Sequence, residues 1–264
     1  DADLAHAVDG ALWGAFANAG QSGAGMSRVY VLRDVAERFE SELVAGARRL
    51  RLGSPLEWTT DIGPLLEPAA RDRVIELVGT ACDAGAQLRC GGAVDLDGLA
   101  GAFYAPAVLT GVDREMGVIR EDVPGPVLSV VAVDSLDQAV ELANDPPGAL
   151  GASVWTLDRA TGERLAAALR AAKVGINDHP AAPSPRQVSL AFRAHVSAKL
   201  RVWEPSRLRD RRWYPYDETL ARAARATVRY LYGRESDRPR VLREDAIPAL
   251  RVARRLARDA LRRQ

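Results

Sequence analysis

The chain has 264 residues, of which 47% are hydrophobic and 27% are charged, a composition typical of a globular protein. The net charge of +1 gives no argument for a nucleic-acid-binding protein. The two cysteines, Cys82 and Cys90, are too few for a disulfide framework, which favours a reducing compartment. Because no run of about 18 apolar residues and no signal-peptide pattern occurs, we expect a cytoplasmic protein without a membrane anchor.

The first predicted element is a helix that Asp1 and Asp3 can cap and that ends near Gly20. Its apolar residues recur at every fourth position, as on one face of a helix: Leu4, Val8, Leu12 and Phe16. After the small residues at 21–27, the sequence Arg-Val-Tyr-Val-Leu at 28–32 predicts a buried strand, because it is rich in β-branched and aromatic side chains.

Helices and strands then alternate as far as residue 177. Helices are predicted at 34–50, 71–84, 136–143 and 159–172, and strands at 86–90, 105–112, 125–133, 151–157 and 173–177. In the helix at 71–84 the inward positions are Val74, Leu77, Val78 and Ala81, and Gly91 and Gly92 are expected to close the strand at 86–90. This alternation predicts an α/β fold with a mostly parallel sheet that helices cover on both faces.

Near Pro180 the pattern changes, which predicts a division into residues 1–180, 181–206 and 207–264. Residues 179–185 predict a loop, 194–204 an extended edge segment, and the rest two helices rich in arginine. The last helix is basic and amphipathic, as in helices that bind membranes or nucleic acids. It lacks the aromatic residues that anchor such a face, so packing on the chain or on a partner is favoured, with no nucleic acid and no membrane as ligands.

Several stretches resemble, in the same order, the catalytic domain of the aldehyde dehydrogenase superfamily. Residues 1–21 followed by 28–31 are similar to the helix, the N-A-G-Q-x-C turn and the strand of that family. The further matches are 45–74 with R-x-G-x-P and D-x-G-P-L, 83–92 with G-A-x-x-x-x-G-G, 101–112 with G-x-F-x-x-P-T-x-L, 120–133 with E-E-x-F-G-P-V, and 141–158 with A-N-x-x-x-Y-G-L-G-A-S-V-W-T. The resemblance implies a three-layer α/β catalytic domain, normally preceded by a nicotinamide-binding domain and completed by an oligomerising β-flap.

In that family a cysteine thiolate attacks the aldehyde, the hemithioacetal transfers hydride to NAD(P)+, and a glutamate-activated water hydrolyses the thioester. The turn of this chain is N-A-G-Q-S-G-A-G, so the resemblance assigns Gly23 to the position of the cysteine, where the nucleophile is lost. Ser22 is disfavoured as a replacement because neighbouring side chains on such a turn point in different directions and no strong base is evident, and Ser27 because it lies too far along, at the entry to the strand. Cys82 and Cys90 are expected to be packed or surface thiols.

The cofactor positions of the family are also substituted. The resemblance assigns Asp122 to the glutamate that binds the cofactor ribose, one methylene shorter, and Pro124 to a phenylalanine that borders the nicotinamide. The alternative for Glu121 and Asp122 is a solvated turn before a strand. The general-base glutamate belongs to an E-L-G-G-K stretch upstream of the region that Asp1 begins, and the P-F-G-G-x-K-x-S-G loop is not recognisable after Asn177. We therefore expect that the chain alone binds neither NAD nor NADP, and we leave the aldehyde unassigned.

Other kinds of site are disfavoured. Residues 20–25 are rich in glycine, but a phosphate-binding turn runs from a strand to a helix and this one runs from a helix to a strand. His6, His179 and His195 are too scattered to indicate a metal site or a catalytic triad, so they are expected to be surface or packed histidines.

Three hypotheses for the function follow. The first is a degenerate domain with a role in assembly, in which Ser197–Glu204 adds to a partner's sheet in a homo- or hetero-oligomer. The second is part of an active enzyme whose nucleophile and cofactor domain come from another segment or subunit. The third, of a different class, is a binding module that uses the arginine-rich region from Arg207 onward for an acidic partner.

Overall fold

The structure, a computed structural model, describes residues 1–145, 150–179 and 200–203. The chain divides into two units, Asp1–Arg209 and Asp210–Gln264, and all described residues belong to the first unit. The predicted loop after His179 and the predicted C-terminal helices lie outside the described residues, so the predicted division of the chain stays a prediction. Among the described helices, none has the length and apolar character needed to cross a membrane.

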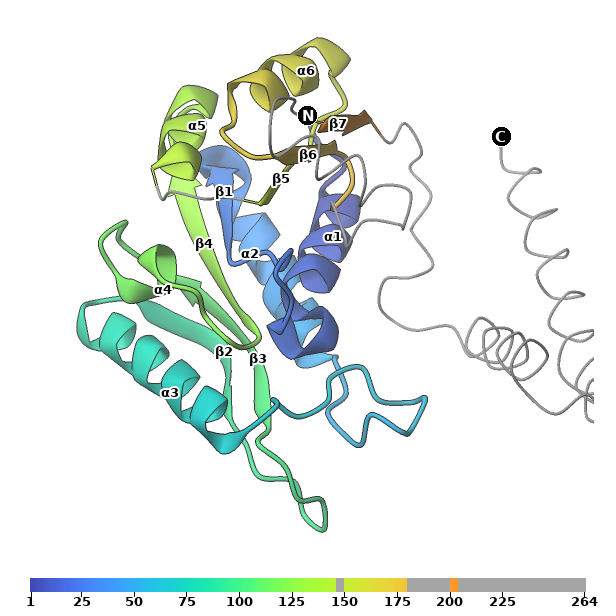
Figure 1. The fold of residues 1–264 in the computed structure, drawn as a ribbon. Coiled ribbons are helices and arrows are strands. Elements are labelled where there is room, and N and C mark those ends of the chain that lie inside the picture. The colour runs from blue at the N-terminus through green and yellow to red at the C-terminus, as the bar shows by residue number, and fades with distance from the viewer. Residues whose placement is uncertain (146–149, 180–199, 204–264) are drawn as a thin grey trace, which may run out of the picture. The chain divides into compact units, whose positions relative to one another are not determined.

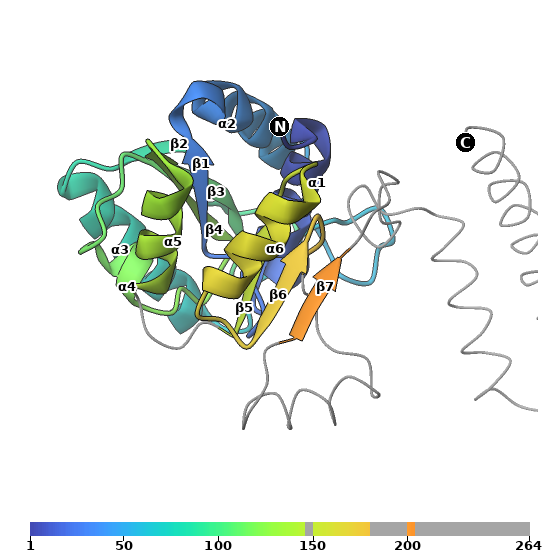
Figure 2. The ribbon, with the colours of Figure 1, turned by 90° about the horizontal axis from the view of Figure 1, so that it is seen from above.

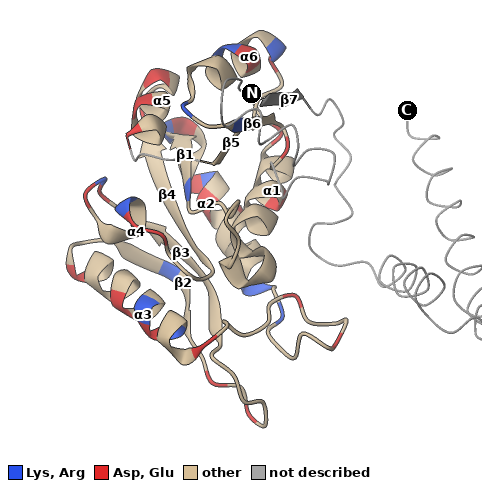
Figure 3. Cartoon of the chain, in the orientation of Figure 1, with Lys and Arg blue, Asp and Glu red and all other residues tan. Residues whose placement is uncertain are grey.

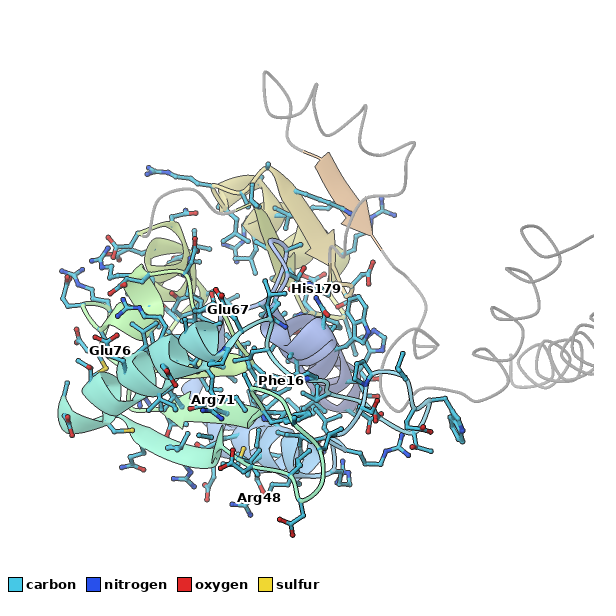
Figure 4. The ribbon with its side chains drawn as sticks, turned by 60° about the horizontal axis from the view of Figure 1, so that its bottom comes forward. Phe16, Arg48, Glu67, Arg71, Glu76 and His179 are labelled. Atoms are coloured by element: carbon cyan, nitrogen blue, oxygen red, sulfur yellow. The ribbon has the colours of Figure 1, made fainter. Side chains whose placement is uncertain are left out.

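The N-terminal helix α1 (Leu4–Phe16) begins where the sequence predicts it. Asp3 is its cap, since the Asp3 side chain accepts a hydrogen bond from the backbone N–H of His6 at 3.1 Å. Phe16, in the last turn, is completely buried (Figure 4). The helix is followed by the 3₁₀ turn η1 (Ala17–Gly20), which leads into the glycine-rich turn before the first strand.

The main sheet has four strands in the order β1-β4-β3-β2. The strands are β1 (Arg28–Leu32), β2 (Gln87–Ala93), β3 (Tyr104–Thr110) and β4 (Val127–Val133). β1, β4 and β3 run parallel and β2 runs antiparallel to β3, which confirms the mostly parallel sheet. The central strands β3 and β4 contain no charged residue and are the most buried (Figure 3).

Helices cover both faces of this sheet, as the alternation predicts (Figures 1 and 2). α1 and α2 (Arg33–Arg48) lie on one face, and α3 (Pro68–Asp83) and α5 (Leu136–Asn144) lie on the other. The short helix α4 (Gly117–Arg120) precedes the loop that leads into β4. The inward face of α3 is the predicted one: Val74, Leu77, Val78 and Ala81 are buried.

A second, parallel sheet has the order β5-β6-β7. It consists of β5 (Gly151–Val154), β6 (Lys173–Ile176) and β7 (Leu200–Trp203), with α6 (Arg159–Ala168) between β5 and β6. Its core contains Val154, Leu165, Ala166, Leu169, Ala171, Val174 and Ile176. The predicted edge segment thus contributes β7, which pairs with β6 of the same chain.

Three local predictions were wrong. The helix predicted at 159–172 ends at Ala168, because Leu169 is extended and buries its side chain in the core of the second sheet. The strand at 28–32 is only partly buried, since β1 is an edge strand and Val31 alone of its residues is fully covered. Gly91 and Gly92 do not end β2 but lie within it, at shifts of register with left-handed φ of +89° and +128°.

Candidate functional site

The turn at residues 21–27 connects α1 to β1 and contains the predicted nucleophile position. It is entered through three consecutive residues in the left-handed region, Asn18 and Ala19 with φ of 55° and Gly20 with φ of +73°. The backbone N–H of Ser22 donates to the carbonyl of Gly20 at 2.9 Å, and that of Gly25 donates to the carbonyl of Ser22 at 2.9 Å. The backbone itself therefore closes the turn, and non-glycine residues in left-handed conformations are a local cost that this closure offsets.

Contacts with three elements hold the two ends of the turn in place. The N–H of Met26 donates to the carbonyl of Gly14 in α1 at 2.9 Å, and the carbonyl of Ser27 accepts from the N–H of Ser129 in β4 at 3.0 Å. At the other end, Gly20 lies against the loop before β4, because a Cβ on Gly20 would lie 2.3 Å from the carbonyl oxygen of Gly125. Only glycine fits there, which explains the residue type at the start of the turn.

Gly23 lies at the exposed apex of this turn. A Cβ built on Gly23 would meet no atom within 4 Å, and its φ lies outside the left-handed region that favours glycine. Neither sterics nor backbone conformation therefore requires a glycine at this position, in contrast to Gly20. The turn has room for a side chain at residue 23, and none is present.

The other nucleophile candidates are elsewhere or are already engaged. The Ser22 hydroxyl accepts the N–H of Ala24 at 3.3 Å within the turn. Cys82 lies in α3 and Cys90 in β2, both half-buried. The Cys90 thiol lies 3.6 Å from the carbonyl oxygen of Pro106, and burial raises its pKa, which disfavours the thiolate.

The loop between α4 and β4 carries the two predicted cofactor positions, Asp122, which is exposed, and Pro124, which is half-buried. The neighbouring Glu121 forms an ion pair with Arg73 of α3, whose guanidinium also binds Glu76 at 2.6 Å. Glu121 is therefore part of a surface ion-pair cluster. The contact between Gly20 and Gly125 brings this loop next to the start of the candidate turn.

The N-termini of α5 and α6 are poorly suited to the diphosphate of a dinucleotide, which binds at a free helix N-terminus after a strand. The N-terminus of α5 is capped by the Ser135 hydroxyl, which accepts from the N–H of Gln138 at 3.1 Å. The N-terminus of α6 is capped by the carboxylate of Asp158, which accepts from the N–H of Thr161 at 3.0 Å, and this hydrogen bond lowers the pKa of Asp158. At α5 and α6 an anion would therefore have to displace a side chain, and at α6 a negative one. α2 follows β1 without a side-chain cap but has the acidic Asp34 in its first turn.

The described histidines contact the same part of the fold. The His6 ring lies 3.1 Å (Nε2) from the carbonyl oxygen of Asn177 and packs on Trp155. His179 is buried beside α1 (Figure 4), with its ring against Gly14 and edge-on to Trp13. Burial lowers the pKa of His179 to about 4, so it is neutral at physiological pH.

Within the described ranges, no three side chains of His, Cys, Asp or Glu group closely enough to hold a metal ion. His195 lies outside them. Sequence reasoning missed two residues that organise this region, Gln21 and Asn177, both of which use side-chain amides to bind distant backbone. Periodicity does not reveal such bonds. The one sequence signal for Gln21 is its place in the N-A-G-Q motif.

Comparison with known proteins identifies the family. The sequence profile described as the aldehyde dehydrogenase family matches residues 1–189. The betaine aldehyde dehydrogenases of Mesorhizobium japonicum and Brucella anthropi are each 37% identical to the chain over 185 residues, which are 69% of this chain and 38% of the relative. The chain therefore spans less than two fifths of the length of these relatives.

Solved structures give the same result. An NAD+ complex of aldehyde dehydrogenase from Bacillus cereus is similar with a TM-score of 0.66 and 36% identity, over 69% of this chain and 37% of that one. Betaine aldehyde dehydrogenase from Staphylococcus aureus, in complex with NAD+, gives a TM-score of 0.67 and 32% identity over 70% and 37% of the two chains. With a matching profile over most of its length and the same arrangement of helices and strands, this chain belongs to the aldehyde dehydrogenase family.

Proposed function

We propose that this chain is a catalytically inactive domain of the aldehyde dehydrogenase family and that it acts in assembly. The observation that carries the proposal is Gly23, at the position that the resemblance assigns to the nucleophilic cysteine. Covalent attack on an aldehyde carbon requires a side-chain nucleophile, and glycine has none. Because the turn has space for a side chain at this position, the loss of the nucleophile is not explained by packing.

Neighbouring groups are poor substitutes. Ser22 keeps its hydroxyl in a hydrogen bond within the turn, and a serine needs an adjacent base to become nucleophilic. The raised pKa of Cys90 favours its unreactive thiol form. These features argue against a replacement nucleophile in the described part of the chain.

We further propose that the chain alone does not hold NAD or NADP. The solved relatives are described as NAD+ complexes, and the chain corresponds to about 37% of their length. The side-chain caps of α5 and α6 are unsuited to a diphosphate, and Asp122 and Pro124 replace the glutamate and phenylalanine that the resemblance assigns to the cofactor. In the family the cofactor accepts hydride from the substrate, and that step would require residues beyond this region.

The assembly role draws on exposed apolar surface and on an edge strand. Leu56 and Leu66, in the connection between α2 and α3, are 87% and 88% exposed. We propose these two side chains as part of a surface that another polypeptide covers. β7 lies at the end of its sheet in the described topology, so the segment Ser197–Glu204 is suited to add a partner's strand, in a homo- or hetero-oligomer.

A second candidate is a component of an active enzyme whose nucleophile and cofactor domain come from another segment or subunit. The observation in its favour is the coverage, since 62% of each curated relative has no counterpart in the match. A G-x-x-x-x-G cofactor turn and an E-L-G-G-K stretch in the adjoining coding sequence would support this candidate. A complete assembly that oxidises an aldehyde, with no gain from Gly23→Cys, would show that another group acts as nucleophile.

Inactivity is tested with the purified full chain, betaine aldehyde and NAD+, by following NADH formation. We expect no turnover. In parallel, the chain and its Gly23→Cys variant are treated with iodoacetamide and mapped by peptide mass spectrometry, with Gly23→Ala as the matched control. We expect a new adduct in the peptide containing Gln21–Met26 only in the cysteine variant. NADH formation by the unsubstituted chain, or an aldehyde adduct on its turn, would overturn the proposal.

The assembly role is tested separately by analytical ultracentrifugation of the full chain over a range of concentrations. We expect a defined oligomer, and association that weakens when Leu56 and Leu66 are both replaced by serine. Serine at these exposed positions leaves the fold intact because neither side chain is part of the core. A chain that is monomeric at all concentrations would contradict self-assembly. The assembly role would then stand only as a hetero-oligomer, and only if a co-purifying subunit is found.

A further inference from the structure

The carboxamide of Gln21 joins the candidate turn to the connection between α2 and α3. Its Oε1 accepts the backbone N–H of Leu66 at 2.8 Å. Its Nε2 donates to the carbonyl of Asn18 at 3.2 Å and, at 3.5 Å, to that of Pro64. The amide and the carbonyl oxygen of this one side chain therefore bind backbone groups both in the entry to the turn and in the connection between α2 and α3.

Asn18 completes a reciprocal pair with Gln21. The Nδ2 of Asn18 donates to the backbone carbonyl of Gln21 at 3.0 Å, while the Gln21 side chain donates to the backbone carbonyl of Asn18. Both bonds close over Ala19 and Gly20, which hold left-handed conformations. The pair thus stabilises the costly entry into the turn, in the way that asparagine side chains often support turns.

The segment to which Gln21 binds is itself fixed at its base. The Asp61 carboxylate is 3% exposed and accepts three hydrogen bonds from Arg51, from the backbone N at 2.9 Å, Nε at 2.8 Å and Nη2 at 3.1 Å. Further along, the N–H of Leu65 donates to the carbonyl of Ala102 at 2.9 Å. Gln21 therefore ties the turn to a part of the fold that is already held by a multidentate ion pair and by backbone bonds.

We propose that Gln21 is the positioning residue of the candidate site, which sets the direction in which position 23 projects. The inference deepens the proposed function and depends on it only in taking residue 23 as the position at which the family reaction begins. Ser22, Ala24 and Gly25 form hydrogen bonds within the turn, and the Ala24 backbone also bonds His179, so the orientation of the apex depends on the two ends of the turn and on this one contact. Met26 fixes the end next to β1, and Gln21 fixes the end next to α1.

This role differs from general packing in what it controls. Gln21 is half-buried, and leucine, of similar volume, would fill the same space but lose every hydrogen bond of the carboxamide. Glutamate would keep the acceptor for the Leu66 N–H and lose the donors to Asn18 and Pro64. A reacting group must be held within a fraction of an ångström, so loss of these bonds would be felt at residue 23 even where the fold survives.

The experiment places a nitroxide label on the full chain through Gly23→Cys and records its electron paramagnetic resonance spectrum. So that residue 23 alone can carry the label, Cys82 and Cys90 are both first replaced by serine. The label is compared in four backgrounds: parent, Gln21→Leu, Gln21→Glu and Gln138→Leu. Gln138 is the matched control, since its Oε1 accepts the backbone N–H of Asp134 at 2.7 Å, far from the turn in sequence.

We expect a restricted spectrum in the parent and in Gln138→Leu, a mobile one in Gln21→Leu, and an intermediate one in Gln21→Glu. Hydrogen exchange of the Leu66 amide should accelerate at least about tenfold in Gln21→Leu, the loss expected for one hydrogen bond, and remain slow in Gln21→Glu. Denaturation curves check that each variant is folded. If Gln21→Leu does not fold, the glutamate variant decides.

An unchanged label spectrum in folded Gln21→Leu, or in Gln21→Glu if only that variant folds, would overturn the positioning role. The result is independent of the inactivity proposed above. Aldehyde oxidation by the unsubstituted chain would overturn the proposed inactivity without changing the label spectra. Equal label spectra in the parent and in folded Gln21→Leu would overturn the positioning role without bearing on the proposed inactivity.

Discussion

Gly20 lies directly against Gly125, so closely that a Cβ on Gly20 would come within 2.3 Å of the Gly125 carbonyl oxygen. This contact joins the end of η1 to the loop before β4, two regions that are distant in the sequence. It is the point at which the turn with Gly23 and the loop with Asp122 meet. The geometry of the candidate site therefore depends on the absence of a side chain at residue 20.

Gly20→Ala should destabilise the chain by about 3 kcal/mol or more, because the methyl group meets rigid backbone and alanine disfavours the left-handed φ. The matched variant Gly23→Ala meets no neighbouring atom and should change the free energy of unfolding by at most about 1 kcal/mol, in the stabilising direction. Urea denaturation of both variants gives the comparison. Similar losses in the two variants would show that the turn is not packed as described.

The stability of the chain should fall on acidification through His179. Its pKa in the folded chain is about 4 against an ordinary value of 6.5, so the unfolded chain binds this proton first as the pH falls. The contribution is complete above pH 6.5 and is lost progressively toward pH 4, by up to about 3 kcal/mol at about 1.4 kcal/mol per pKa unit.

His179→Phe keeps a ring and removes the titration. Above pH 7 the two proteins differ by the packing of the new ring and by the lost hydrogen bond to the Ala24 backbone, a difference that does not change with pH. Between pH 6.5 and 4 the parent should lose stability relative to the variant. Carboxylates contribute equally to both curves. Urea midpoints at several pH values test this, and a constant difference between parent and variant over that range would contradict the buried neutral histidine.

Asn177 should be important for the second sheet. Its φ is 57°, its Oδ1 accepts the N–H of Thr156 at 2.9 Å, and its Nδ2 donates to the Thr156 carbonyl at 2.8 Å. Asn177→Ala should cost about 3 kcal/mol, from two hydrogen bonds of about 1 kcal/mol each and a left-handed alanine. Asn177→Gly loses the same bonds without that strain and should cost about 1 kcal/mol less. Equal losses in the two variants would show that the left-handed conformation is not maintained in solution.

Much of the fold could be predicted from local patterns. The four inward residues of α3 follow helical spacing, and Asp3 caps α1, because both features depend on residues within a few positions of each other. The end of α6 could not be predicted in this way. Alanines on both sides of Leu169 favour a continued helix, but burial of Leu169 in the second core decides the backbone.

The candidate site was less accessible to sequence reasoning. The resemblance points to Gly23, Asp122 and Pro124. Only the tertiary structure reveals that a side chain has room at residue 23 and none at residue 20. The bonds of Gln21 to Leu66 and the burial of His179 likewise join parts of the chain that no periodic pattern connects. The roles of Gly23, Asp122 and Pro124 stay predictions until the chemical tests are made.

The irregular strand β2 has a consequence for unwanted pairing between copies of this chain at the border of the main sheet. Its two left-handed glycines shift its register against β3, and its place at the end of the main sheet leaves its other side without a strand among the described residues. A straight strand from another molecule could not form an unbroken ladder along such a bent border. The irregular edge of the main sheet thereby disfavours edge-to-edge pairing with strands of other molecules. We therefore expect that β2 does not initiate aggregation when newly made chains are concentrated.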